Sequence, residues 1–113
     1  MHELSLAESA LELIVDAARR EGAVRVRRVR LEIGMLSCVE TGALRFAFEV
    51  ASTGTCVEGA RLDILTVAGE GRCSACGISA GMETGYELCP QCQTRPLQVV
   101  RGNGMRVRDI DIE

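Results

Sequence analysis

Apolar residues near the start of the chain recur every three or four positions, the spacing of one face of an α-helix. Ser5 and Glu8 have the spacing of a capping box, so we expect the helix to begin near Leu6. Gly22 is a natural end for it. We interpret the stripe as a core-packing face rather than a binding face. Its members are Leu6, Ala10, Leu13, Ile14, Ala17 and Ala18.

An alternating pattern follows and predicts a β-strand over residues 24–33. Val29, Leu31 and Ile33 alternate with polar residues, whereas Val26 is out of phase with them. We therefore expect a bulge or a change of partner near residues 27–28.

A second helix is predicted over residues 39–51, because Ser37 and Glu40 repeat the capping-box spacing. Alternation then predicts a strand at residues 62–66 and a last strand at residues 105–112. The apolar side of the second helix comprises Leu44, Ala47, Phe48 and Ala51, broadened by Phe46 and Val50.

This order of elements predicts an α+β fold: a three-stranded mixed β-sheet with two helices on one face, plus an inserted four-cysteine zinc-ribbon domain. We expect the main domain to comprise residues 1–69 and 104–113 and the insertion residues 70–103. Gly69 to Gly71 would be a hinge into the insertion.

Two Cys-x-x-Cys pairs, separated by twelve residues, are the most specific motif in the chain, because few kinds of site use this spacing. Two such pairs can complete a tetrahedral all-sulfur metal shell. The segment between them has too few apolar residues to fold by burial alone, so metal bonds would supply folding energy. We predict a structural zinc site, with iron left open. The ligands would be Cys73, Cys76, Cys89 and Cys92.

Other uses of these cysteines fit less well. Disulfides need an oxidising compartment, and the acidic N-terminus does not look like a secretory signal. Thioredoxin-like chemistry lacks a βαβ pattern, and haem attachment lacks a histidine after either pair. Gly77 and Gln93 occupy that position, where we expect positive φ at Gly77 and a more strained turn at Gln93.

Composition narrows the class of protein further. The 113 residues fit one small domain or a core with one insertion, and no apolar run approaches transmembrane length. All thirteen basic residues are arginine, and the net charge is −3, which argues against a dedicated nucleic-acid binder. The default location is the cytoplasm.

One basic cluster has no interleaved aromatic residues, so we expect a solvated strand face or a docking surface for an acidic protein. It contains Arg25, Arg27, Arg28 and Arg30.

His2, the only histidine, directly follows the initiator methionine. A free α-amine, ionisable amides and an imidazole form a nitrogen set that square-planar Ni(II) or Cu(II) prefers. Taken alone, this signal is weak, because an N-terminal histidine is usually just exposed.

The stretches MHELSLAESALELI, VRLEIGMLSCVETGALRFAFEV and GTCVEGARLDI, followed by the paired Cys-x-x-Cys motifs, closely resemble the HypA/HybF family of hydrogenase maturation nickel chaperones. The resemblance covers essentially the whole chain. It implies a non-enzymatic carrier in which His2 ligates nickel with the Met1 amine and the backbone of Glu3, while the four cysteines hold zinc. It implies delivery, with a partner GTPase, to the large subunit of [NiFe]-hydrogenase, and in some organisms to urease.

Two departures from the family pattern are visible. Family members usually have Gly at the position of Cys38 and an aliphatic residue at that of Cys56, and we expect both cysteines to be packed thiols rather than ligands. Competing hypotheses are a zinc-ribbon nucleic-acid adaptor and a protein-interaction module whose terminus binds no metal. Membrane binding is not expected, and monomer and homodimer both stay open.

Overall fold

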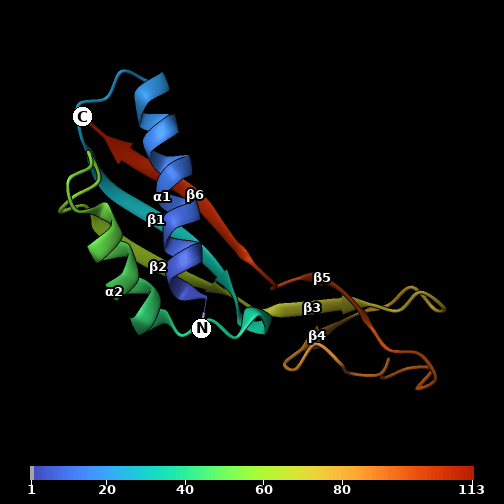
Figure 1. Ribbon diagram of the computed structural model, residues 1–113. Helices are drawn as coiled ribbons and strands as arrows, with labels where there is room; N and C mark the ends of the chain where they lie inside the picture. The colour runs from blue at the N-terminus through green and yellow to red at the C-terminus, as the bar shows by residue number, and fades with distance from the viewer. Residues whose placement is uncertain (1) are drawn as a thin grey trace. The chain divides into compact units, whose positions relative to one another are not determined.

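The structure is a computed structural model that describes residues 2–113 (Figure 1). Its first sheet has the order β2-β1-β6 and its second the order β4-β3-β5. Within the described residues, no helix is both long and apolar enough to cross a membrane. The elements are α1 (Glu3–Arg20), β1 (Val26–Gly34), the 3-10 helix η1 (Met35–Ser37), α2 (Thr41–Ser52), β2 (Arg61–Val67), β3 (Gly69–Arg72), β4 (Ser79–Met82), β5 (Gln98–Arg101) and β6 (Met105–Ile112).

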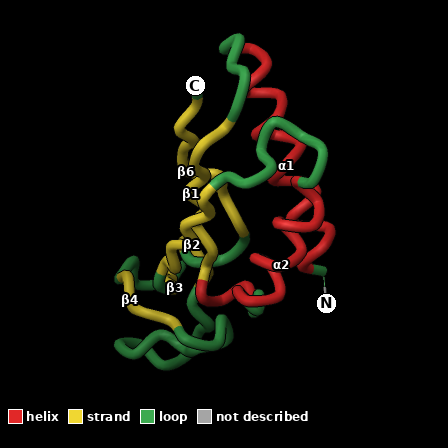
Figure 2. Tube along the Cα trace, turned by 90° about the vertical axis from the view of Figure 1, so that its left-hand side faces the viewer, coloured by secondary structure: helices red, strands yellow, loops and turns green. Residues whose placement is uncertain are grey.

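The first sheet confirms the predicted α+β architecture. Strands β1 and β2 point the same way and β6 runs against them, so the sheet is mixed (Figure 1). Both helices cover one face of this sheet (Figure 2). One apolar stripe of each helix is buried against this sheet face, so the five elements share one core. The buried side chains include Ala7, Ala10, Ile14, Ala18, Val26, Val29, Leu31, Leu44, Phe48, Val57 and Leu62.

Helix α1 begins earlier than predicted, because His2 rather than Ser5 is its N-cap. The carboxylate of Glu3 accepts the backbone N–H of Glu40 at 3.1 Å, which ties the first turn to the start of α2. Ser5 therefore lies inside the helix, and the expected capping box does not form. The C-terminal prediction is confirmed: α1 ends at Arg20 and Gly22 has φ 67°.

The apolar stripes of the two helices are narrower than the sequence suggested. The buried face of α1 runs through Ala7, Ala10, Ile14 and Ala18, whereas Leu13 is 61% exposed. Small alanines let the helix approach the sheet closely, so a narrow stripe is sufficient. On α2 the residues expected to broaden the stripe are also exposed; these are Phe46 (68%) and Val50 (55%).

The cap of α2 also differs from the predicted one. Glu40 is the N-cap, and its carboxylate accepts the backbone N–H of Ala43. Ser37 instead ends η1, where its hydroxyl donates to the carbonyl of Gly34 at 2.6 Å. A serine used inside its own turn cannot cap the next helix, so the second capping box was also a wrong prediction.

The predicted phase change in β1 is confirmed. Val26 and Val29 are both buried, with Arg27 and Arg28 between them. The backbone N–H of Val26 donates to the carbonyl of Cys56 at 2.9 Å, outside the strand ladder. The change of phase is therefore present in the strand, whereas the expected bulge or change of partner near residues 27–28 stays a prediction.

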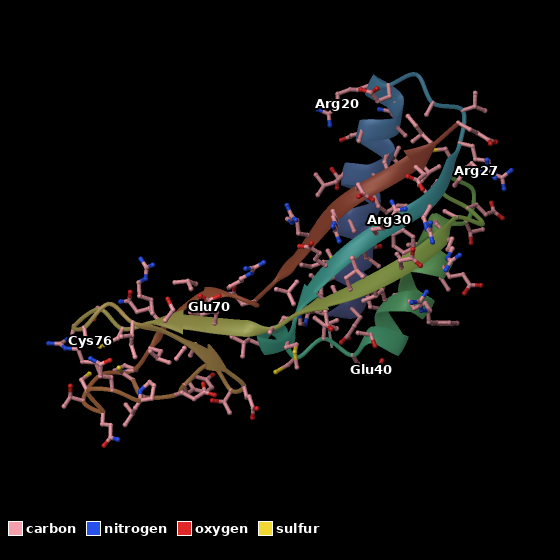
Figure 3. All side chains as sticks on the ribbon, turned by 180° about the vertical axis from the view of Figure 1, so that it is seen from behind. Arg20, Arg27, Arg30, Glu40, Glu70 and Cys76 are labelled. Carbon is pink, nitrogen blue, oxygen red and sulfur yellow. The ribbon has the colours of Figure 1, made fainter. Side chains whose placement is uncertain are left out.

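Ion pairs with the chain's own acids neutralise most of the basic cluster on β1. Arg28 donates to Asp63 at 2.8 Å, and Arg30 pairs with both Asp109 and Asp111. Arg27 lies 3.6 Å from a carboxylate oxygen of Glu113. Figure 3 shows Arg27 and Arg30 on the sheet face opposite the helices. The expectation of a solvated strand face is confirmed, and little unpaired positive charge is left to bind an acidic partner.

The chain divides into two compact units. The first contains the residues up to Glu32, Val39–Leu65 and Met105–Glu113, and the second contains Ile33–Cys38 and Thr66–Gly104. The segment that includes η1 thus belongs with the cysteine motifs, although it precedes α2 in sequence.

Gly69 to Gly71 form strand β3 rather than the predicted hinge. A Cβ at Gly69 would lie 2.5 Å from the carbonyl oxygen of Met82, and one at Gly71 would lie 2.4 Å from the Met82 sulfur. These glycines are therefore explained by close packing in the second unit, not by flexibility.

We predict a pH-dependent contribution of Asp63 to stability. Removal from water raises the pKa of Asp63, but the positive charges of Arg28 and Arg61 outweigh this and hold it below its ordinary value of 3.8. Because the pKa of Asp63 is lower in the folded protein than in the unfolded chain, its carboxylate stabilises the fold at pH values above the pKa of the unfolded chain. This stabilisation is lost as the pH falls through the pKa of the folded protein. The free energy of unfolding of Asp63→Asn should be lower than that of the wild type at neutral pH, because the ion pairs with Arg28 and Arg61 are lost.

Denaturant unfolding of both proteins between neutral and strongly acid pH tests this prediction. Loss of metal in acid affects both proteins equally, so only the difference between them is used. The difference should shrink towards zero below pH 3.8. A difference that stays constant with pH would contradict it.

Candidate metal centre

Four cysteine sulfurs converge in the second unit. The sulfur atoms of Cys73, Cys76, Cys89 and Cys92 all lie within 4.8 Å of one another. The separations are 3.7 Å for Cys73–Cys92 and 3.5 Å for Cys76–Cys89. Zinc–sulfur bonds of about 2.3 Å in a tetrahedron place sulfurs about 3.8 Å apart. The spacing therefore fits one tetrahedral metal ion, and within residues 2–113 no other cluster of such ligands occurs.

Two similar backbone turns present these sulfurs. In the first, the N–H of Gly77 donates to the carbonyl of Cys73, and in the second the N–H of Gln93 donates to that of Cys89, each at 2.9 Å. Both turns need positive φ, which is 76° at Gly77 and 58° at Gln93. The expected conformation at Gly77 and the more strained one at Gln93 are thus confirmed.

The ligands are also the core of the second unit. Its buried cluster consists of Cys73, Met82, Cys89 and Leu97, so two of its four members are metal-ligand candidates. Besides these, only partly buried apolar side chains such as Leu36, Ile78 and Val99 pack against the cluster, which is too small a core to fold a unit of this size by apolar burial alone. Metal–sulfur bonds are needed to stabilise this unit.

The thiols have unequal pKa values. The hydroxyl and backbone of Thr94 lower the pKa of Cys92 to about 6. The backbone of Ile78 favours the thiolate of Cys76, but removal from water and the neighbouring thiols outweigh it and raise its pKa to about 11. Ligands bind zinc as thiolates, so binding at neutral pH releases protons.

Glu87 organises the loop between the two cysteine pairs. Its carboxylate accepts the backbone N–H groups of Glu83 at 2.6 Å and of Thr84 and Gly85 at 3.0 Å each. The first two of these bonds lower the pKa of Glu87 to about 2. Neither Glu87 nor Thr94 was predicted from the sequence, because the spacings Glu-x-Cys and Cys-x-Thr are too common to indicate these contacts.

The expected nickel ligand His2 is exposed at the N-cap of α1, and its carbonyl accepts the backbone N–H of Leu6 at 3.0 Å. Glu3 is buried, and its carboxylate binds the backbone of α2. Met1, the other expected donor, lies outside the described residues. The structure thus keeps the imidazole accessible while fixing the residue that follows it.

The two remaining cysteines do not join the metal cluster. Cys38 is exposed, so the expectation of a packed thiol was wrong for it. Its φ of 56° lies in the left-handed region, which gives a physical reason for the glycine usual at this position. Cys56 is half-buried.

The chain is similar in sequence and in structure to known proteins. A family model described as "Hydrogenase/urease nickel incorporation, metallochaperone, hypA" matches residues 1–112. The chain belongs to this family. HypA-family proteins named hydrogenase maturation factor HypA are 47% identical in Dechloromonas aromatica and 42% identical in Acidithiobacillus ferrooxidans, over 113 residues and 100% of both chains. The HypA solution structure from Helicobacter pylori, titled a Ni metallochaperone, matches with TM-score 0.78 and 27% identity over 99% of this chain and 97% of that one.

We predict that Gly77→Ala weakens zinc binding by roughly tenfold, because an alanine at positive φ costs about 1–2 kcal/mol. Gly81→Ala is the matched control, since its Cβ would meet nothing within 4 Å and its φ is not positive. Competition with a zinc chelator measures both. Equal zinc affinities of Gly77→Ala and Gly81→Ala would show that the positive φ at residue 77 does not require glycine.

We also predict that Glu87→Gln loosens the loop between the cysteine pairs. Glutamine keeps one acceptor oxygen and turns an N–H₂ group towards the backbone donors, so at least one of the three hydrogen bonds is lost. Amide hydrogen exchange of residues 83–85 should accelerate relative to wild type and to the control Glu70→Gln. Unchanged exchange would contradict the role given to Glu87.

Proposed function

We propose that the chain is a metallochaperone, and not an enzyme, that binds Ni(II) at its N-terminus and acts in the cytoplasm. It would deliver the ion, together with a partner GTPase, to the large subunit of [NiFe]-hydrogenase. Membership of the nickel-incorporation family supports this function. The family description also names urease, which is the second candidate recipient.

The proposed nickel ligands are the His2 imidazole, the amides of His2 and Glu3, and the α-amine of Met1. This nitrogen set suits Ni(II). An α-helix does not use its first N–H groups in its own hydrogen-bond ladder, so metal at these amides leaves α1 intact. A terminus can open without unfolding the domain, which gives the cargo a route of release.

The proposed resident ion is Zn²⁺, held by Cys73, Cys76, Cys89 and Cys92. Sulfur spacing near that of a zinc tetrahedron supports this assignment. Bound there, the ion would supply structural cross-links only, because four protein ligands leave no open coordination position.

A nucleic-acid adaptor receives less support than it had from the sequence. Arg27, Arg28 and Arg30 each pair with a carboxylate of the same chain, so they offer little charge to phosphates.

We predict that His2→Ala, or any residue added before Met1, weakens Ni(II) binding by at least roughly a hundredfold, because loss of a hydrogen-bond partner of a metal ligand already costs about 10–100-fold and here a ligand itself is lost. Zinc content and thermal unfolding should not change, since His2 contributes neither a zinc ligand nor buried surface. Isothermal titration of untagged protein measures the effect.

The matched control extends the other end of the chain, beyond Glu113, by the same residues. Wild-type nickel affinity in this control, together with loss in the N-terminal variants, is the expected pattern. Unchanged affinity in His2→Ala would overturn the assignment of the nickel site.

A further inference from the structure

The two helices leave a groove on the outer side of the helical layer. They start at the same end of the sheet, where Glu3 contacts Glu40, and run side by side (Figure 1). A groove of about 420 Å³ is lined by one side of α1 and by Ala51 of α2. None of the proposed nickel ligands lines this groove.

The floor of the groove is apolar. Leu11 and Val15 of α1 and Ala51 of α2 line it, and all three are only half-buried. Val50 adjoins Ala51 on α2, and Phe46 lies one turn earlier; these two are 55% and 68% exposed. The first unit therefore leaves uncovered apolar surface along α2 that a partner could bury.

One rim of the groove is acidic. Glu8, Glu12 and Asp16 are spaced four residues apart on α1 and line the groove, as does one basic residue, Arg19. Asp16 lies 3.8 Å from Arg19, whereas Glu8 and Glu12 make no ion pair with any residue in the range 2–113.

The opposite face of the sheet is different, because its charges are matched within the chain. Arg28 pairs with Asp63, Arg30 with Asp109, and Arg106 with Glu32. Uncompensated negative charge beside apolar surface is thus specific to the helical side. Positive charge on a partner would complement it.

We propose that this groove binds an amphipathic helix of a partner protein, with apolar residues on one face and Lys or Arg along its edge. A third helix fits between two packed helices by ridges-into-grooves packing, with its apolar face on Leu11, Val15 and Ala51. Its basic residues would lie against Glu8 and Glu12.

A second copy of this chain does not supply such a helix. α1 carries the acidic rim itself, and the charged residues of α2 are Arg45 and Glu49, which cancel. An anionic membrane surface would be repelled by the same rim. A basic helix from another protein is therefore the occupant that the charges favour.

The test uses a synthetic amphipathic helix of about 18 residues, long enough for about five turns, with leucine on one face and lysine on the flanks. A matched peptide carries glutamate in place of lysine. Binding is followed by fluorescence anisotropy and by amide chemical shifts of the full-length, metal-loaded protein. The lysine peptide should bind, with shifts at residues 8–19 and 46–51, and the glutamate peptide should not.

Two variants locate the site. Glu8→Gln/Glu12→Gln should weaken binding of the lysine peptide roughly fivefold to tenfold, as expected for two exposed charge contacts. Glu70→Gln/Glu83→Gln changes the net charge equally but lies in the second unit, and should bind as wild type does. Ala51→Arg should abolish binding by filling the floor with a positive charge.

Circular dichroism and thermal unfolding verify that each variant is folded. If Ala51→Arg does not fold, the paired glutamine variants still decide the question. Equal binding of both peptides, equal losses in the two double variants, or shifts confined to other surfaces would overturn the proposal. Concentration-dependent self-association lost in Glu8→Gln/Glu12→Gln would overturn it too, because the occupant would then be a second copy.

Discussion

Convergence of four cysteine sulfurs on one point is the constraint on which the second unit depends. Its buried core contains only Met82 and Leu97 besides two of the cysteines. Apolar burial on this scale does not fold a segment that contains three short strands, whereas a metal–sulfur cross-link does. Within a unit that metal binding would stabilise, Glu87 orders the loop between the cysteine pairs and the glycines of β3 allow close packing.

The first unit is stabilised without a metal site. It is stabilised by a conventional core between two helices and a mixed sheet, and by ion pairs on the outer sheet face. It therefore needs no metal to fold. The proposed site at its terminus, centred on His2, would gain and lose an ion without structural cost, whereas loss of the ion from the cysteine site would destabilise the second unit. This contrast is what a carrier with one resident and one transient metal requires.

Periodicity and spacing predicted most of this architecture: both helices, the three strands of the first sheet, the four converging cysteines and the positive φ of Gly77 and Gln93. Helix starts were wrong, because contacts distant in sequence decided them: Glu3 reaches Glu40, and η1 uses Ser37. Strand β3 was missed since its glycines look like a hinge until the packing of Met82 is seen. Hydrophobic periodicity and motif spacing do not predict such contacts between residues that are distant in sequence.

The division between a sulfur-bound resident ion and a nitrogen-bound cargo is tested most directly by X-ray absorption at both metal edges of one untagged sample. The zinc spectrum should show four sulfurs at about 2.3 Å, and the nickel spectrum should show nitrogen and oxygen neighbours with no sulfur. Sulfur in the nickel shell, or a zinc shell that lacks it, would contradict the account.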